Sequence, residues 1–353
     1  MHFSQTKILY LCGDLSLTGG IEKYNSDFIS AIKLSGSKVK VVQRRVGAIS
    51  SKISFVFYLF ISIFTFRPTH IVCAHLHFSS LALIISQVLR IKYSVSIYGI
   101  EAIEIRKKIH QIALNKAEKI IVISEYTKKL VNSQFNFSSE KYFMLISSVT
   151  ENSNNFIEDT AFLKNKYGLG GAPVVLTISR CSPSEEKGQH RVVISFKEVL
   201  KNFPDAKYVM AGPGKDHRID KALALSPITN KSVINLGRVS DEQRTELYNL
   251  CDVFVLPSKN EGFGIVFIEA LASGARVIAS NGYGCKEGLL NGTLGTLVEP
   301  DDTNQIANAI SHELAKSRVL RDRMEIRNKT LEVYGYEAWC QKIVNFLIQI
   351  GSK

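Results

Sequence analysis

Residues 252–269 read DVFVLPSKNEGFGIVFIE, in which an apolar run, a polar turn, a Gly-Phe-Gly sequence and a second apolar run follow one another. The first run, 252–257, has the length and composition of a strand buried on both faces. Glycines disfavour a helix through the turn, so the helix is expected to begin near Gly264. A strand, a turn and a helix in this order predict one unit of a parallel α/β sheet.

Two glutamates, Glu261 and Glu269, frame the turn and the start of this helix. A glycoside-hydrolase pair would need carboxyl groups roughly 5 to 9.5 Å apart, whereas eight positions on one helix span about 12 Å with a rotation of roughly 80°. We instead expect Glu261 on a loop and Glu269 in the second helical turn, with an anion site at the helix N-terminus between them. A phosphate bound there would repel both carboxylates unless each accepted hydrogen bonds from neutral hydroxyl groups. Sugar hydroxyls on either side of the phosphates could supply these, which indicates a nucleotide-sugar site.

Strand-like runs alternate with helix-like stretches along the rest of the chain, as in parallel α/β sheets. The polar, glycine-ended segment 148–172 divides the runs into two series and predicts the domain junction. We expect Rossmann-like domains at 1–160 and 161–335, and an amphipathic helix at 336–353 that returns to the first domain. The predicted strands are 7–11, 39–43, 70–74, 93–97 and 119–123, then 173–179, 207–212, 232–237, 252–257, 276–280 and 293–300.

The composition is that of a globular protein kept under reducing conditions. Of the 353 residues, 45% are apolar and 22% are charged, which excludes disorder as the main state. The six cysteines form no CxxC pair and no cluster with histidine, so reduced thiols are expected. The N-terminal sequence lacks the pattern of a secretory signal. We therefore expect a cytoplasmic protein.

The positive charge is concentrated in the first half of the chain, where residues 1–171 carry 21 Lys and Arg against 11 Asp and Glu. The apolar run 53–66 would form a helix of about 21 Å, too short for a hydrocarbon core of roughly 30 Å. It is either a fully buried helix or a segment partly immersed in a bilayer surface. No nucleic-acid motif is present, so anionic lipid is the favoured partner and nucleic acid is not expected. The cations that bracket the run are Arg44, Arg45, Lys52 and Arg67.

Loops that follow predicted strands carry phosphate-binding residue types, because ligands of open α/β sheets bind beyond the carboxyl ends of strands. Gly19 and Gly20 open a helix after the first strand, where backbone can approach a diphosphate closely; a tight turn without ligand is the alternative. Arg180 and Lys187 flank another such loop and suit phosphate oxygens and a departing diphosphate. The two acids of that loop could instead pair with them.

Two histidines, His75 and His77, follow the predicted strand 70–74. Alternating histidines can bind a metal, but no third ligand with suitable spacing is visible. Contact with substrate and capping of the following helix both remain open for this pair.

Five segments together resemble the retaining GT-B-type glycosyltransferases known as family 4 or group 1. The resemblance covers nearly the whole chain in the expected order and is strongest from about residue 173 to 315. Its most specific element is the pair Glu261 and Glu269 with Gly-Phe-Gly inside and Pro-Ser before it. The segments are GGIEKYNSDF (19–28), SRCSPSEEKGQH (179–190), AGPGKDH (211–217), the stretch 236–280 and NGTLGTLVEPDD (291–302).

This resemblance implies two Rossmann-like domains that face each other across a cleft, and transfer of a sugar from a nucleoside diphosphate sugar without a metal or other cofactor. It implies that Glu269 binds the ribose hydroxyls and Glu261 contacts the donor sugar, while Arg180 and Lys187 bind the diphosphate. The other implied donor contacts are Gly19, Gly20 and the backbone amides of Gly262, Phe263, Gly264 and Ile265.

One departure from the family concerns the loop after the fourth strand, where Tyr98, Gly99 and Glu101 replace a frequent histidine-glycine pair. A tyrosine with a pKa near 10 would not act as a base at neutral pH, although its hydroxyl can contact a sugar. In the implied mechanism a donor phosphate oxygen takes the acceptor proton, so activity need not be lost. Tyr98, Glu101 and His75 are thus the predicted sugar or acceptor contacts. A second departure is Tyr283-Gly284 in place of a commoner glycine pair.

The basic first half and the run 53–66 favour a lipid-linked glycan acceptor in surface polysaccharide assembly, at the cytoplasmic face of a membrane. A sugar-nucleotide epimerase of the same fold is one alternative. A non-catalytic protein that binds membrane or glycan is another.

Overall fold

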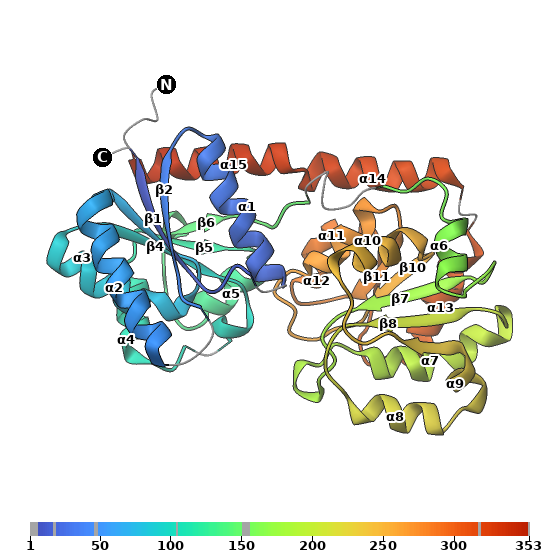
Figure 1. Cartoon of the computed structure of the whole chain (residues 1–353). Coiled ribbons are helices and arrows are strands. Elements are labelled where there is room, and N and C mark those ends of the chain that lie inside the picture. Colours follow the sequence, from blue (N-terminus) through green and yellow to red (C-terminus); the bar gives the residue numbers. More distant parts are fainter. Residues whose placement is uncertain are drawn as a thin grey trace. The chain divides into compact units, whose positions relative to one another are not determined.

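The computed structural model describes residues 6–16, 19–45, 49–103, 105–149, 156–316 and 319–351, without the side chains at 49–52 and 100. The chain divides into two compact units, Met1–Ser147 with Glu337–Lys353, and Ser148–Tyr336. Each unit is built on a six-stranded sheet whose neighbouring strands are all parallel (Figure 1). The predicted α/β fold class is confirmed.

The sheet of the first unit has the order β2-β1-β3-β4-β5-β6, which places β2 at one edge. Five of its strands agree with the predicted runs to within one residue at either end. The sixth, β6, was not predicted, because its three residues are too few to form a recognisable pattern. The strands are β1 (Lys7–Cys12), β2 (Lys38–Gln43), β3 (His70–Cys73), β4 (Lys92–Ile97), β5 (Lys119–Val122) and β6 (Tyr142–Met144).

Helices cover both faces of this sheet. One face packs against α2 (Ile49–Phe66), α3 (Ser79–Leu89), α4 (Lys108–Lys116) and α5 (Glu125–Asn132), whose buried residues form one cluster with β1, β3, β4 and β5. The other face packs against α1 (Gly20–Leu34) and α15 (Tyr336–Gly351). There the Phe28 ring contacts Tyr10, Trp339 and Phe346 edge-on at 5.5 to 6.1 Å. The most C-terminal helix is therefore part of the core of the first unit.

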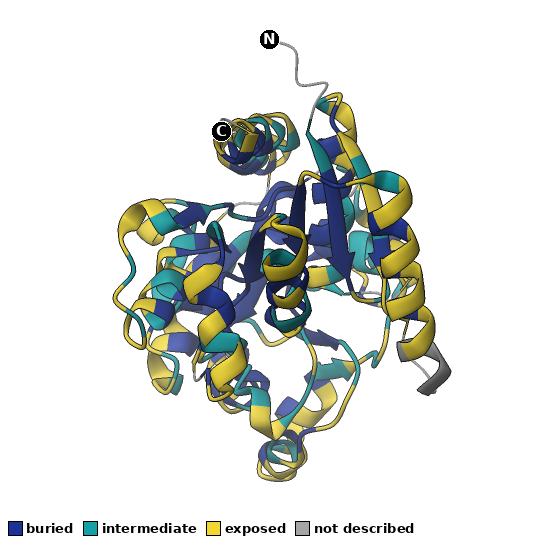
Figure 2. Ribbon diagram, turned by 90° about the vertical axis from the view of Figure 1, so that its left-hand side faces the viewer, coloured by how far each residue is buried: buried dark blue, intermediate teal, exposed yellow. Residues whose placement is uncertain are grey.

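The helix α2 is buried on one side only, so the first of the two alternatives, a fully buried helix, is wrong. Its buried apolar side chains recur every fourth residue, at Phe55, Leu59 and Ile63. Figure 2 shows such alternation of buried and exposed positions along the helices. Nowhere in the described part of the chain is a helix long and apolar enough to cross a membrane. The exposed large apolar residues of α2 are Ile53, Val56, Phe57, Tyr58, Phe60, Ile61 and Phe64. The side chain of Lys52, one of the cations that bracket the run, is not among those that the structure describes.

The sheet of the second unit has the order β12-β11-β10-β7-β8-β9. All six strands fall within the predicted runs, because their Val- and Ile-rich sequences are bounded by polar or glycine-containing turns. They are β7 (Val174–Ile178), β8 (Lys207–Ala211), β9 (Val233–Asn235), β10 (Val253–Leu256), β11 (Arg276–Ser280) and β12 (Thr296–Val298).

Two helical layers bury this second sheet. One face packs against α7 (Gln189–Asn202), α8 (His217–Ala224) and α13 (Thr303–Ala315). The other packs against α6 (Ala161–Lys166), α10 (Asp241–Leu250) and α11 (Ile265–Ala272). Near the ends of the unit, the Val149 N–H donates to the Tyr334 carbonyl at 2.8 Å. The remaining α-helices are α9 (Pro227–Ser232), α12 (Cys285–Gly288) and α14 (Leu320–Tyr334).

Candidate active site

The loops that follow β7, β10 and β11 are joined by backbone hydrogen bonds. The Lys259 N–H, after β10, donates to the Glu186 carbonyl, after β7, at 2.9 Å. The Gly284 N–H, after β11, donates to the Glu261 carbonyl at 2.8 Å. Parallel strands direct these loops to one edge of the sheet, where ligands of such sheets bind. The second unit thus assembles one site from three separate segments.

The centre of this site is an ion pair between Lys187 and Glu261. Lys187 Nζ lies 2.8 Å from Glu261 Oε2, and the two side chains are only 14% and 18% exposed. Burial alone would lower the pKa of Lys187, but the attraction to Glu261 outweighs it, so the pKa is raised. Lys187 is therefore held in its charged form beside a carboxylate.

Arg180 differs from Lys187 in its surroundings. Its side chain is 68% exposed, and its guanidinium pairs with Glu185 of the same loop at 2.8 Å. This is the pairing within the loop that the sequence left open. A role of Arg180 on a diphosphate stays a prediction.

The start of α11 is shaped by glycine. Gly264 precedes the helix with a φ of +84°, so the helix begins where the sequence predicted it. A side chain on Gly284 would place its Cβ 2.0 Å from the Gly262 carbonyl oxygen, which shows how closely these loops pack. The Phe263 ring is buried and contacts Tyr334 at 5.8 Å. The backbone from Gly262 to Ile265 is thus fixed in place, and the first N–H groups of a helix lack intrahelical acceptors.

Glu269 lies in the second turn of α11 and is 4% exposed. The Tyr248 hydroxyl donates to Glu269 Oε2 at 3.1 Å. Burial would lower the pKa of nearby Arg244, but Glu269, Tyr248 and Asp241 together raise it. Sequence reasoning missed Tyr248 and Arg244, since nothing in helix α10 marks them as neighbours of Glu269.

Arg191 is a second residue that the sequence did not reveal. It is 6% exposed, and its guanidinium donates to the Pro257 carbonyl and to Glu186 Oε2, each at 3.1 Å. These contacts connect the loop that bears Lys187 to the loop that bears Glu261.

In the first unit, the structure brings His75, Tyr98 and Glu101 together. The Tyr98 N–H donates to Glu101 Oε1 at 2.6 Å, and His75 Nε2 lies 4.0 Å from the same oxygen. The Tyr98 hydroxyl is buried and donates to Asn25 Oδ1 at 3.0 Å, and burial raises its pKa. That hydroxyl would have to leave Asn25 to reach a sugar.

His75 caps the short helix that follows β3. Its Nδ1 accepts from the His77 N–H at 3.2 Å, and the two rings stack at 4.5 Å. Capping, one of the two open interpretations, is therefore present. In the described ranges no group of three His, Cys, Asp or Glu side chains is placed to hold a metal ion.

The predicted phosphate turn at Gly19 and Gly20 lies where expected, with α1 beginning at Gly20. A Cβ on Gly19 would fall 2.2 Å from a carboxylate oxygen of Glu22. An acid of the first turn thus lies against this helix start.

Two α/β units of this kind, with loops gathered at carboxyl strand ends, are the architecture of the GT-B fold. Sucrose-phosphate synthase of Thermosynechococcus elongatus superposes with a TM-score of 0.81 and 17% identity over 99% of this chain and 100% of that one. Anabaena HepE, solved with UDP and glucose, superposes with a TM-score of 0.77 and 19% identity over 97% and 99%. These likenesses establish the fold.

Residues 159–331, which lie within the second unit, match the family model described as glycosyl transferases group 1. A GDP-mannose-dependent alpha-(1-6)-phosphatidylinositol monomannoside mannosyltransferase of Mycolicibacterium smegmatis is 28% identical over 58% of this chain and 55% of its own length. The capsular polysaccharide biosynthesis glycosyltransferase CapM of Staphylococcus aureus is 31% identical over 62% and 59%. The chain spans little more than half the length of these relatives.

Proposed function

We propose that the protein is a glycosyltransferase that moves a sugar from a nucleoside diphosphate sugar to a glycan acceptor and retains the anomeric configuration. The observation that carries this proposal is the buried Lys187–Glu261 pair beside the start of α11, with Glu269 one turn further on. A fixed cation, a helix N-terminus and two carboxylates suit a diphosphate flanked by hydroxyl-bearing groups. The group 1 domain supports the same assignment.

Each residue then has a distinct task in donor binding. The backbone amides from Gly262 to Ile265 donate to phosphate and sugar oxygens, as the start of a helix allows. Glu269 accepts from the ribose hydroxyls, and Glu261 accepts from a hydroxyl of the donor sugar. Lys187 and Arg180 stabilise the charge that develops on the departing nucleoside diphosphate.

The transfer step needs no basic side chain. The acceptor hydroxyl attacks the anomeric carbon from the face of the leaving group, and the bond between that carbon and the phosphate oxygen breaks. The acceptor proton passes to an oxygen of the departing phosphate. Because Lys187, Arg180 and the helix N-terminus supply positive charge, we propose that no metal is required. This mechanism is compatible with the buried hydroxyl of Tyr98.

The proposed acceptor is a lipid-linked glycan in surface polysaccharide assembly at the cytoplasmic face of a membrane. One relative is named for a phosphatidylinositol monomannoside substrate and another for capsular polysaccharide biosynthesis. The excess of positive charge in residues 1–171 supports a partner with anionic groups.

The deciding experiment incubates the full chain with UDP- and GDP-sugars, with and without lipid-linked glycans, in the presence and absence of EDTA. Transfer with an unchanged anomeric configuration, read by NMR, is the expected result. Isomerisation of the donor without acceptor would identify an epimerase, and binding without turnover would identify a non-catalytic protein. Activity abolished by EDTA would contradict the metal-free mechanism.

A further inference from the structure

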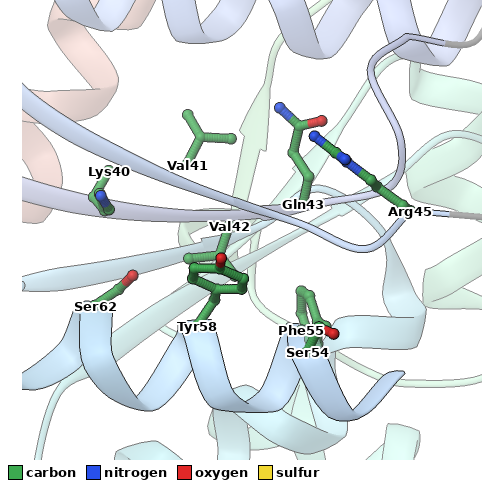
Figure 3. Close-up of a pocket in the computed structure, with 9 residues that line it drawn as sticks. All are labelled: Lys40, Val41, Val42, Gln43, Arg45, Ser54, Phe55, Tyr58 and Ser62. Atoms are coloured by element: carbon green, nitrogen blue, oxygen red, sulfur yellow. The ribbon is translucent and has the colours of Figure 1, made fainter. Parts of the chain in front are cut away.

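A groove of about 490 Å³ lies in the first unit between the edge strand β2 and helix α2 (Figure 3). The sheet ends at β2, and among the described strands none lies beyond β2 to cover this side of α2. Tyr58 and Ser62 rise from α2 toward the strand, while the side chains of Gln43 and Arg45 lie side by side. Lys40 lines the groove from β2. Hydroxyl, amide and cationic groups therefore surround one open space.

The charge of this groove is positive and unopposed. None of its lining residues is acidic. Among the described residues, neither Lys40 nor Arg45 forms an ion pair, and both are exposed. The surrounding segment 28–100 contains no Asp or Glu at all. Its nine cations are Lys33, Lys38, Lys40, Arg44, Arg45, Lys52, Arg67, Arg90 and Lys92.

The outer face of α2 presents an apolar stripe next to this groove. Ile53, Phe57, Phe60 and Phe64 are 67%, 63%, 53% and 69% exposed. Their spacing of three or four residues places them along one side of the helix. Contiguous exposed apolar side chains on this scale mark an interaction surface, and aromatic residues beside cations suit the interface of an anionic bilayer.

We propose that this groove binds the phosphate of an anionic phospholipid while α2 lies along the bilayer with its stripe in the acyl boundary. The Arg45 guanidinium and the Lys40 ammonium pair with phosphate oxygens. The hydroxyls of Tyr58 and Ser62 donate to the remaining oxygens. This contact would bring the enzyme to lipid-linked acceptors, a purpose that rests on the proposed function.

The test is flotation of the full chain with vesicles of pure phosphatidylcholine and with equimolar phosphatidylcholine and phosphatidylglycerol. Binding is expected only to the anionic vesicles and should weaken as salt screens the surface charge. Lys40→Ala and Arg45→Ala should each weaken binding about fivefold, as for one cation near an anionic surface. A double Phe57→Ser/Phe60→Ser variant should lose most of the binding.

Matched controls come from the second unit. The same kinds of substitution are made there at two exposed residues that do not line the groove. Phe162 is 56% exposed, and the side chain of Lys201 is 64% exposed. Phe162→Ser and Lys201→Ala should float like the native protein. Thermal melting should show the α2 variants folded, whereas Phe55→Ala, at a buried site, should lower the melting temperature.

Three outcomes would overturn the proposal. The first is failure to float on anionic vesicles at low salt. The second is unchanged binding of Lys40→Ala and Arg45→Ala, which would remove the groove from the site. The third is equal flotation with vesicles of pure phosphatidylcholine, which would show that the protein does not recognise anionic lipid. Donor binding by the second unit is measured separately, so neither result depends on the other.

Discussion

Lys187 Nζ lies 2.8 Å from Glu261 Oε2, although the two residues are 74 positions apart. The residue proposed to meet the diphosphate and the residue proposed to meet the donor sugar thus neutralise each other before a donor arrives. A bound donor must share or replace this bond. Because a buried charge without a partner is costly, each of the two side chains stabilises the other.

Replacing Glu261 with Gln should lower the pKa of Lys187, because burial then acts without an opposing carboxylate. In the native protein the pKa of Lys187 is raised above its value in the unfolded chain, which is about 10.4. The ion pair therefore stabilises the fold fully at a pH below the unfolded-state pKa. This stabilisation is lost as the pH rises through the folded-state pKa. At neutral pH the variant should lose about 1.5 to 3 kcal/mol of unfolding free energy. The difference should shrink at high pH.

Denaturant titrations across the alkaline range measure this difference. Glu325 offers the control, since it pairs with Lys329 at 2.7 Å while both side chains are more than half exposed. Glu325→Gln should leave stability almost unchanged. If the unfolding free energies of the native protein and of Glu261→Gln changed in parallel with pH, the proposed effect of Glu261 on the pKa of Lys187 would be contradicted.

Glu269→Ala should weaken donor binding tenfold to a hundredfold, since a buried hydrogen bond to a charged group contributes about 1.5 to 3 kcal/mol. Tyr248→Phe, which removes only the hydroxyl that donates to Glu269, should weaken it about fivefold. Calorimetry with the donor found in the transfer assay measures both. An unchanged affinity in Glu269→Ala would refute its role at the ribose.

Arg180→Ala should lower kcat by a factor on the order of 10² to 10³ and alter donor affinity less, if Arg180 stabilises the leaving group. Its exposed ion pair contributes little to stability, so the melting temperature should not change. Lys201→Ala, which removes another exposed ion-paired cation, should leave both quantities unchanged. Steady-state kinetics measure kcat and KM. A change confined to KM, with kcat unaltered, would show that Arg180 acts only in ground-state binding.

Lys187→Ala should lower kcat as well but should also destabilise the fold.

Gly284→Ala should destabilise the protein by about 1 to 3 kcal/mol and weaken donor binding, because the added methyl group meets the Gly262 carbonyl. Gly282→Ala is the matched control, with no atom within 4 Å of its added carbon. Thermal melting and calorimetry of the two variants test this packing. Equal effects at Gly284 and Gly282 would show that the close packing of Gly284 against the Gly262 carbonyl contributes neither to stability nor to donor binding.

The sequence predicted the two sheets well because buried parallel strands are continuous apolar runs bounded by turns. It failed at β6, where a run of only three residues carries no periodicity. It left two alternatives open for α2, because this helix is apolar almost all round. In such a helix the neighbouring elements, and not the sequence pattern, decide which side is buried.

For the candidate site, the sequence predicted the helix start at Gly264 and the placement of Glu261 and Glu269 on a loop and a helix. Both follow from local backbone preferences. The Lys187–Glu261 and Tyr248–Glu269 contacts were not foreseen, since they join segments whose meeting depends on the folded chain. The same holds for Arg191. The chemical roles of these residues remain predictions that the variants above address.

The position of α15 in the core of the first unit has a consequence for synthesis on the ribosome. Phe28 and Phe143 emerge early but contact the Phe346 ring, which is made only after the whole second unit. The second unit, Ser148–Tyr336, is continuous and has all its strands available sooner. The domain that is translated first is therefore expected to finish folding last. Until then it exposes an aromatic surface that would need protection by chaperones.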